Sequence, residues 1–293
     1  MSDMQCNHNL FKVELNGLEF AYNEFGNERD PLVLFAHGAG QTRHAWFESA
    51  KELSENGFRT VVFDARGHGD SGWPPDQAYT IQDFARDLRD VACNFSNGSG
   101  GPHIVGASLG GLSALVSEGV LEPGVFTSIT LVDITPNMNF SGVEKIMGFM
   151  SANSSSGFES LDRAAETISL YLPHREKPGK LDGLRKNLRL KDDGRWYWHW
   201  DPALIDSFYK QAREESIDQF DAALRSIKVP IHLVRGRMSE LVTEASVKHF
   251  MELAPHAQYT DVANASHMIA GDSNETFNSA VVDFLLQHHV GSA

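Results

Sequence analysis

Residues 103–115 read His-Ile-Val-Gly-Ala-Ser-Leu-Gly-Gly-Leu-Ser-Ala-Leu, and this stretch decides the fold. A short apolar run ends at Val105 and predicts a buried strand, and from Leu109 onward leucines recur at helical spacing. Between them, the pattern Gly-x-Ser-x-Gly places Ser108 at a sharp turn. A strand, a tight turn with a serine at its apex and a helix together form the context of a nucleophile elbow.

The glycines around Ser108 have a physical reason. A nucleophile at such a turn sits in a strained backbone conformation, and the strand and helix approach closely on either side. Positions two before and two after must then be small, as Gly106 and Gly110 are. The motif alone is weak, because a Gly-rich turn that carries a bystander serine matches it too; the surrounding pattern has to decide.

Composition bounds the class of protein. The chain has 293 residues, 41% of them hydrophobic and 22% charged, as in an ordinary globular protein. Its net charge of −14 opposes binding to nucleic acid or to an anionic membrane. Cys6 and Cys93 are the only cysteines, too few for a disulfide framework and without metal-ligand spacing. No signal peptide or apolar run of about 20 residues is visible, so a cytoplasmic location is the default expectation.

The chain alternates strand and helix signals on both sides of an interruption. Residues 11–25 alternate apolar and polar around Asn16-Gly17, which predicts a β-hairpin. Thr80 and Asp83 form a capping box that opens a helix. Further strands are expected over 32–36, 60–64, 126–132, 231–234 and 258–262, and helices over 44–56, 80–95, 243–253 and 274–289. This rhythm predicts an α/β fold with a mostly parallel, doubly wound sheet and right-handed crossovers.

Residues 137–226 interrupt the rhythm. They lack strand signals and predict several short helices joined by polar loops. We therefore expect a core of 1–136 and 227–293 and a helical cap, or lid, over 137–226. The insertion begins just after a strand's carboxyl end, which is the side where open α/β sheets bind ligands.

The combined pattern resembles the α/β-hydrolase superfamily, and the resemblance covers essentially the whole chain. It rests on the elbow, the His37-Gly38-Ala39-Gly40 turn, the Arg-Gly-His-Gly-Asp-Ser segment at 66–71 and a late histidine, in that order. The chain is most similar to the branch with epoxide-hydrolase-like, haloperoxidase-like and small esterase members. Epoxide hydrolases and haloalkane dehalogenases have an aspartate at the elbow, and Ser108 cannot form their alkyl-ester intermediate.

The resemblance implies a catalytic triad. Ser108 is the expected nucleophile, and His267 is the expected base, because it follows the last strand and satisfies the order Ser, acid, His. For the acid we prefer Glu240, which lies after the strand 231–234 where relatives usually carry Asp. Asp133 is the alternative, since some members draw their acid from the end of the preceding core strand.

The expected oxyanion hole uses backbone N–H groups. One belongs to Leu109, the residue after the nucleophile, and the other to the His37–Gly40 turn, with Ala39 preferred and Gly40 second. Residues expected to line a substrate pocket are His37, Trp196, Trp198 and Met138. For the two tryptophans and Met138, packing within the cap and core is the competing interpretation.

These residues predict a hydrolase that cleaves a carboxylic ester, a lactone or a thioester through an acyl-enzyme. The expected partner is a small, apolar ester, with no metal, cofactor or nucleic acid. Two alternatives stay open. The same triad serves cofactor-free perhydrolases or haloperoxidases and C–C bond hydrolases, and a ligand receptor of this fold can keep the triad without turnover.

Overall fold

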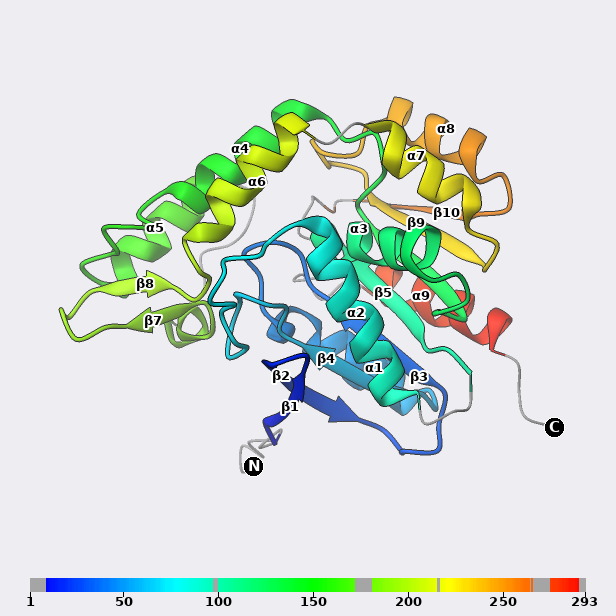
Figure 1. The fold of residues 1–293 in the computed structure, drawn as a ribbon, viewed down its shortest axis with the longest axis horizontal. Coiled ribbons are helices and arrows are strands. Elements are labelled where there is room, and N and C mark those ends of the chain that lie inside the picture. Colours follow the sequence, from blue (N-terminus) through cyan, green and yellow to red (C-terminus); the bar gives the residue numbers. More distant parts are fainter. Residues whose placement is uncertain are drawn as a thin grey trace.

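The computed structural model describes residues 9–96, 100–171, 181–214, 217–263, 265 and 275–289. Eight strands form one sheet in the order β1-β2-β4-β3-β5-β6-β9-β10. The antiparallel hairpin β1–β2 lies at one edge and pairs with β4, and every further pairing is parallel (Figure 1). The strand bounds are β1 Phe11–Leu15, β2 Leu18–Phe25, β3 Leu32–Ala36, β4 Arg59–Phe63, β5 His103–Ala107, β6 Ser128–Val132, β9 Ile231–Gly236 and β10 Gln258–Val262. The predicted sheet is confirmed.

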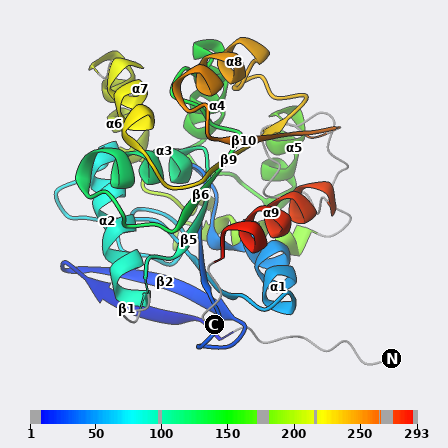
Figure 2. The ribbon, with the colours of Figure 1, turned by 90° about the vertical axis from the view of Figure 1, so that its right-hand side faces the viewer.

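Helices cover both faces of the sheet (Figure 2). On one face α1 (Phe47–Glu55, after the 3₁₀ turn η1 at Arg43–Trp46) and α9 (Glu275–His288) pack over a core that includes Trp46 and Phe277. On the other face lie α2 (Ile81–Phe95), α3 (Leu109–Val116, continued by η2 at Ser117–Leu121) and α8 (Glu244–Leu253). The Thr80 capping box at the start of α2 is present as predicted. Because both faces are covered, strands such as β4, β5 and β6 are buried along their whole length.

Between β6 and β9 the chain forms a layer that we call the cap: α4 (Phe140–Ser151), α5 (Leu161–Tyr171), the 3₁₀ segment η3 (Leu181–Lys186), β7 (Leu188–Leu190), β8 (Trp196–Trp198) and α6 (Ala203–Glu214). The insertion also contains two short strands, for which the sequence carries no signal. Leu188 pairs with Trp198 in an antiparallel hairpin, and Trp196-Tyr197-Trp198 is β8 itself. Aromatic residues favour strands, but a three-residue strand is too short to show a period of two in the sequence.

The helix that follows the cap packs on the core. In α7 (Ile217–Ser226), Leu224 belongs to the same buried cluster as α3 and β6. The Ser226 hydroxyl donates to the Gly119 carbonyl at 2.9 Å. The expected cap of 137–226 therefore ends in a helix that rests on the sheet's own helical layer. No helix within the described residues is long and apolar enough to cross a lipid bilayer.

Candidate functional site

The strand register brings the candidate residues to one edge of the sheet. Ala107 of β5 stands beside Val132 of β6, so Ser108 and Asp133 each follow directly after paired positions. In the same way Val132 stands beside Val234 of β9, and the ladder continues one step further, since the Asp133 N–H donates to the Val234 carbonyl at 2.7 Å. Because all these strands are parallel, the residues that follow them meet at one edge.

Ser108 occupies the strained position that the motif predicts. Its φ is +47° and its ψ −112°, a conformation that residues with a side chain seldom adopt. The Ser108 N–H donates to the Val132 carbonyl at 3.2 Å, which ties the turn to β6. A Cβ on Gly106 would lie 2.7 Å from the carbonyl oxygen of Gly110, so the strand and the helix touch through their backbones. The structure thus holds the Ser108 side chain at the apex, half-buried.

The turn after β3 lies directly against Ser108. A Cβ on Gly38 would be 3.3 Å from the Ser108 Cβ, so only glycine allows this approach without a shift. The turn is held by the Gln41 N–H, which donates to the Gly38 carbonyl at 3.1 Å, and by the Gly38 N–H, which donates to the Gln41 Oε1 at 2.9 Å. Within the described part of the chain, the N–H groups of Ala39 and Leu109 have no hydrogen-bond acceptor. Leu109 also begins α3, whose N-terminal dipole favours negative charge.

Gly40, the second candidate for the oxyanion hole, already has partners for both backbone groups. Its N–H donates to the Nε2 of His68 at 3.2 Å, and its carbonyl lies 3.3 Å from the Nε2 of His199. Its φ of +72° is a left-handed conformation suited to glycine. The geometry therefore favours Ala39 over Gly40 as the donor on this turn.

His37 is part of the structure of this turn. Its Nδ1 lies 2.8 Å from the Gly38 carbonyl, and its Nε2 accepts from the Ala65 N–H at 2.9 Å. This ring is buried, and its centroid is 5.1 Å from that of His68. Burial lowers the pKa of His37 to about 4 and that of His68 to about 3. Both rings are therefore neutral near pH 7, which their roles as hydrogen-bond acceptors require.

The two candidate acids are in opposite environments. The Asp133 side chain is fully buried; its Oδ1 accepts from the Gly236 N–H at 3.1 Å and its Oδ2 from the Ser239 hydroxyl at 2.5 Å. The Glu240 side chain is 64% exposed and pairs with Lys145 of α4 at 2.6 Å. An acid that orients a catalytic imidazole is typically buried and hydrogen-bonded. The geometry thus favours Asp133 and places Glu240 in a surface ion pair, the reverse of the order expected from the sequence.

Ser239 is a contributor that the sequence did not reveal. It follows β9 in the loop where relatives usually carry their acid, and its hydroxyl donates to Asp133 while accepting from the N–H groups of Leu241 and Val242, each at 3.1 Å. The loop after β9 therefore supplies the support for a carboxylate that comes from β6. A serine in a polar loop carries no sequence signal for such a role.

His267 lies outside the described residues. The strand that precedes it, β10, is parallel to β9 and ends at Val262, opposite Gly236. Its carboxyl end therefore points to the same edge as those of β5 and β6. The assignment of His267 as the base stays a prediction from the sequence.

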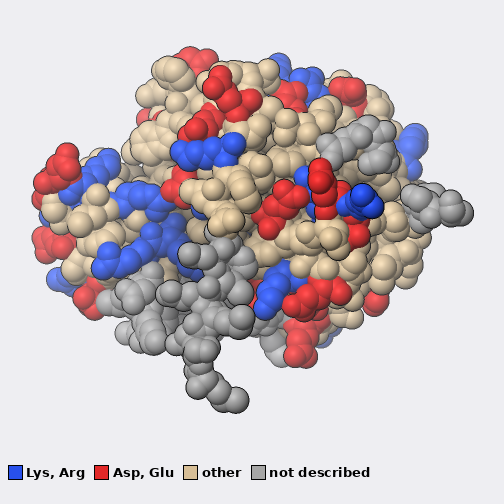
Figure 3. Space-filling model, turned by 90° about the horizontal axis from the view of Figure 1, so that it is seen from below, with Lys and Arg blue, Asp and Glu red and all other residues tan. Residues whose placement is uncertain are grey.

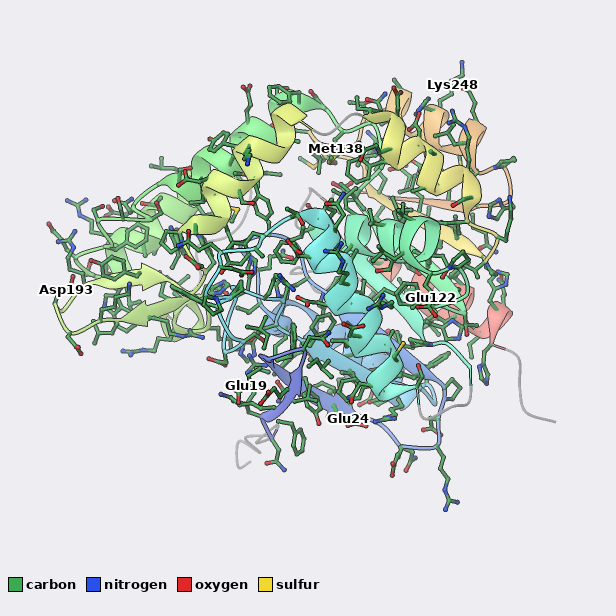
Figure 4. All side chains as sticks on the ribbon, viewed as in Figure 1. Glu19, Glu24, Glu122, Met138, Asp193 and Lys248 are labelled. Atoms are coloured by element: carbon green, nitrogen blue, oxygen red, sulfur yellow. The ribbon has the colours of Figure 1, made fainter. Side chains whose placement is uncertain are left out.

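The residues expected to line the pocket have mainly structural contacts. Trp198 is buried, stacks on Trp200 with 4.6 Å between ring centroids and donates from its indole to the Ala152 carbonyl at 2.9 Å. Trp196 pairs through its backbone with Phe158. Met138 lies where the chain passes from the core into α4 and packs against the core (Figure 4). These contacts favour packing for all three.

A different methionine approaches the site. A Cβ placed on Gly40 would meet the side chain of Met150, from α4, at 3.4 Å. Met150 is buried in a cluster that also contains Met147, Leu109 and Trp198. The end of α4 therefore brings apolar surface against the turn after β3. In the sequence, the helical spacing of Met147 and Met150 does not distinguish a residue near the site from one packed in the core.

Comparison with known proteins agrees with this geometry. A family model described as the alpha/beta hydrolase fold matches residues 31–273. The chain is 29% identical over 247 residues to an esterase of Mycobacterium tuberculosis, which covers 83% of this chain and 78% of that protein. It is 25% identical over 289 residues to a 2-(acetamidomethylene)succinate hydrolase of Mesorhizobium japonicum, with 97% and 98% covered.

A solved structure shares the fold. The crystal structure of an E-2-(acetamidomethylene)succinate hydrolase superposes with a TM-score of 0.80 at 23% identity, over 94% of this chain and 98% of that one. The match of the family model covers most of the chain, and the fold and the family resemblance predicted from the sequence are confirmed. This chain belongs to the α/β-hydrolase fold family.

Proposed function

We propose that the protein is a serine hydrolase that cleaves carboxylic esters through an acyl-enzyme. The main support is Ser108, which is strained at φ +47° and packs against the turn that contains Ala39. In the described chain, the N–H groups of Ala39 and of Leu109, the next residue after Ser108, have no acceptor. Such a strained residue beside unused donors is a typical sign of a site prepared for a reaction. Relatives that are named as an esterase and as hydrolases support the same reaction class.

The proposed reaction has two halves. The Ser108 hydroxyl attacks the ester carbonyl while His267 takes its proton, and the N–H groups of Ala39 and Leu109 stabilise the negative oxygen that forms. The tetrahedral intermediate collapses, and the alcohol leaves with the proton that His267 returns. Water then attacks the acyl-enzyme by the same steps and releases the carboxylic acid and free Ser108. An alkyl-enzyme route of the epoxide-hydrolase kind is excluded, because it needs a carboxylate at the elbow.

We assign the triad acid to Asp133. It is fully buried beside Ser108 in the strand register, and Gly236 and Ser239 hold its carboxylate by two hydrogen bonds. A buried, fixed carboxylate orients the imidazole and stabilises the imidazolium that forms during attack. Glu240, exposed and paired with Lys145, would first have to leave that ion pair.

We infer that the acyl group of the substrate is apolar. Met150 of α4 brings apolar surface to the His37–Gly40 turn, which we call the oxyanion turn, and it shares a buried cluster with Met147. Unbranched thioether side chains adapt to varied shapes. Lys and Arg side chains gather at the cap end of the molecule (Figure 3), whereas Ala39 of the turn packs against a buried hydrophobic cluster.

The test is turnover of p-nitrophenyl esters with acyl chains of two to eight carbons by the wild type and Ser108→Ala. We expect multiple turnover in the wild type and a loss of at least about 10⁴-fold in kcat for the variant. Preference for chains longer than acetyl would support the apolar acyl site. A folded wild type without turnover on the whole series, or a variant that keeps its activity, would refute the proposed function.

A further inference from the structure

The oxyanion turn has a fixed neighbour in the cap, His199, which follows β8. The sequence places this histidine in an aromatic cluster, Trp196-Tyr197-Trp198-His199-Trp200, and the predicted reaction does not use it. In the structure its ring is 1% exposed and lies between two loops of the core. Its Nδ1 accepts from the Gly69 N–H at 2.8 Å, and its Nε2 lies 3.3 Å from the Gly40 carbonyl.

These contacts define one tautomer. A neutral imidazole carries a single N–H, and an Nδ1 that accepts from Gly69 has no proton. The proton is therefore on Nε2, which donates it to the Gly40 carbonyl. His68 has the opposite tautomer, because its Nδ1 lies 2.9 Å from the Arg66 carbonyl and its Nε2 accepts from the Gly40 N–H. The two rings, with centroids 5.9 Å apart, thus hold the two backbone groups of Gly40 from two sides.

Fixing Gly40 fixes the end of the oxyanion turn. The peptide between Ala39 and Gly40 contains the N–H that His68 holds, and the next peptide contains the carbonyl that His199 holds. The start of the turn is coupled to this end. The Gln41 N–H, in the same peptide as the Gly40 carbonyl, donates to the Gly38 carbonyl, which shares its peptide with the Ala39 N–H. Ala39 lies between these anchors, so the direction of its N–H depends on both. An oxyanion donor is effective only when it is fixed in advance toward the developing charge.

His199 itself is held by the cap and by the loop beside it. The backbone N–H of His199 donates to the Asn187 carbonyl at 3.2 Å, within the cap. Two residues later the Asp201 N–H donates to the Gly67 carbonyl at 2.9 Å, and the Asp201 carboxylate accepts from the Tyr79 hydroxyl at 2.7 Å. The segment 199–201 therefore seats the cap on the loop that follows β4, near the β7–β8 hairpin (Figure 1).

We propose that His199 is a positioning residue: through its Nε2–H bond to the Gly40 carbonyl, the cap sets the direction of the Ala39 N–H and completes the oxyanion hole. The inference rests on the proposed function and adds to it. It makes one contact of the cap, the bond between His199 and the Gly40 carbonyl, a condition for stabilising the transition state.

Two substitutions test the hydrogen bonds of the two ring nitrogens separately. In His199→Asn the side-chain oxygen can still accept from Gly69, but no donor reaches Gly40. In His199→Gln the longer amide can place its NH₂ near the position of Nε2 and donate to Gly40. Removing a direct oxyanion donor lowers kcat by about 10²–10³-fold, so loss of a positioning bond should cost about 10-fold. We expect that loss in His199→Asn, with KM within about twofold, and recovery of most of kcat in His199→Gln.

A second readout separates positioning from general structural damage. Butylboronic acid forms a tetrahedral adduct with a catalytic serine and places an oxygen in the oxyanion hole, whereas butyric acid, a product, does not form the adduct. His199→Asn should weaken the boronic acid about as much as it lowers kcat and leave the affinity for butyric acid unchanged. Tyr79→Phe is the matched control. It removes the neighbouring hydrogen bond to Asp201 and should lower the unfolding temperature without changing either kcat or the ratio of the two affinities.

The possible results are distinguishable. A wild type without turnover or boronic acid binding refutes the proposed function. If the wild type turns over esters and His199→Asn keeps full kcat and boronic acid affinity, the inference alone is refuted. An equal loss of affinity for butylboronic acid and butyric acid in His199→Asn also refutes it. If His199→Asn does not fold, ¹⁵N-detected NMR of the wild type decides. An Nε2-protonated His199 whose proton exchanges slowly supports the inference, and an Nδ1-protonated ring overturns it.

Discussion

The edge of the sheet beneath Ser108 and the cap above it are built in different ways. At the edge, backbone packs against backbone: a Cβ on Gly106 would lie 2.7 Å from the main chain of the elbow. In the cap, side chains pack against side chains, as in the stack of Trp198 on Trp200. A Cβ added to Gly148, on the exposed face of α4, would lie in open space. Residue identity is therefore dictated position by position at the edge, whereas much of the cap depends on how its side chains fit together.

We expect the largest difference between the two candidate carboxylates, Asp133 at the edge of the sheet and Glu240, which pairs with Lys145 of the cap. Asp133→Asn should lower kcat for ester hydrolysis by about 10³–10⁴-fold, because an amide cannot stabilise the imidazolium and favours the wrong tautomer. Glu240→Gln, which removes the ion pair with Lys145, should leave kcat within about twofold and stability within about 0.5 kcal/mol. Steady-state kinetics on the two folded variants check this. Full activity in Asp133→Asn together with a large loss of activity in Glu240→Gln would show that Glu240 is the triad acid.

The next effect concerns one methyl group added to each region. Gly106→Ala should destabilise the fold by at least about 3 kcal/mol or prevent folding, because the new Cβ meets main-chain atoms of Gly110 and Gly111 that cannot turn aside. Gly148→Ala adds the same methyl group to an exposed helix position and should stabilise by about 0.5–1 kcal/mol. Urea unfolding of both variants measures the contrast. A Gly106→Ala variant as stable as the wild type would contradict the close contact between strand and helix.

A third prediction uses the histidines where the two regions meet. Burial lowers the pKa of His37 to about 4, that of His68 to about 3 and that of His199 well below its ordinary value of 6.5. Below about pH 6.5 the unfolded chain binds a proton on each of these histidines, whereas the folded chain does not. The contribution of the three neutral rings to the free energy of unfolding is therefore intact above that pH. It falls by about 1.4 kcal/mol per pH unit per histidine as the pH drops toward the folded values.

Urea unfolding at pH 7.5, 6.0 and 5.0 checks the pH dependence. His68→Gln removes one of the buried histidines. The slope of its free energy of unfolding against pH should be smaller by the equivalent of about one proton. Its stability at pH 7.5 should be lower than that of the wild type, because the ring's hydrogen bonds are lost. Equal slopes for the wild type and His68→Gln would show that the buried rings do not titrate as described.

The smallest expected effect is a charged contact between cap and core. Arg189 of β7 pairs with Asp70 at 2.8 Å, and both side chains are about a third exposed. Arg189→Gln should cost less than about 1 kcal/mol in dilute buffer and still less at high salt, because solvent and salt screen such pairs. Thermal unfolding at low and high NaCl concentration measures it. A loss of several kcal/mol, insensitive to salt, would mean that charge holds the cap more strongly than the packing of its side chains.

The contrast between the regions also explains what the sequence revealed. The strands, the elbow and the small turn after β3 were predictable, because buried parallel strands and close backbone contacts demand particular residues at fixed spacing. The hairpin β7–β8 was missed, since Trp196-Tyr197-Trp198 is too short to show alternation. Where side chains fit one another, many residue combinations serve equally well, so no single position carries a signal.

The site divides in the same way. Ser108 and the oxyanion turn follow from local patterns, and the structure places them together. The preference for Glu240 came from its position in the chain. Burial and hydrogen bonding favour Asp133 instead, and the sequence could not show this because the carboxylate after β6 and the serine after β9 meet only in the folded sheet. His199 was counted with the aromatic cluster for the same reason: its partners, Gly40 and Gly69, are more than a hundred residues away in the chain.

Covalent labelling with a fluorophosphonate tests whether Ser108 is an activated nucleophile. The wild type and Ser108→Ala are treated with a fluorophosphonate, and the adducts are measured by intact mass and located by peptide mapping. We expect one adduct per chain in the wild type, on the peptide that contains Ser108, and none in the variant. A folded wild type that stays unlabelled, or an adduct on another residue that persists in Ser108→Ala, would contradict it.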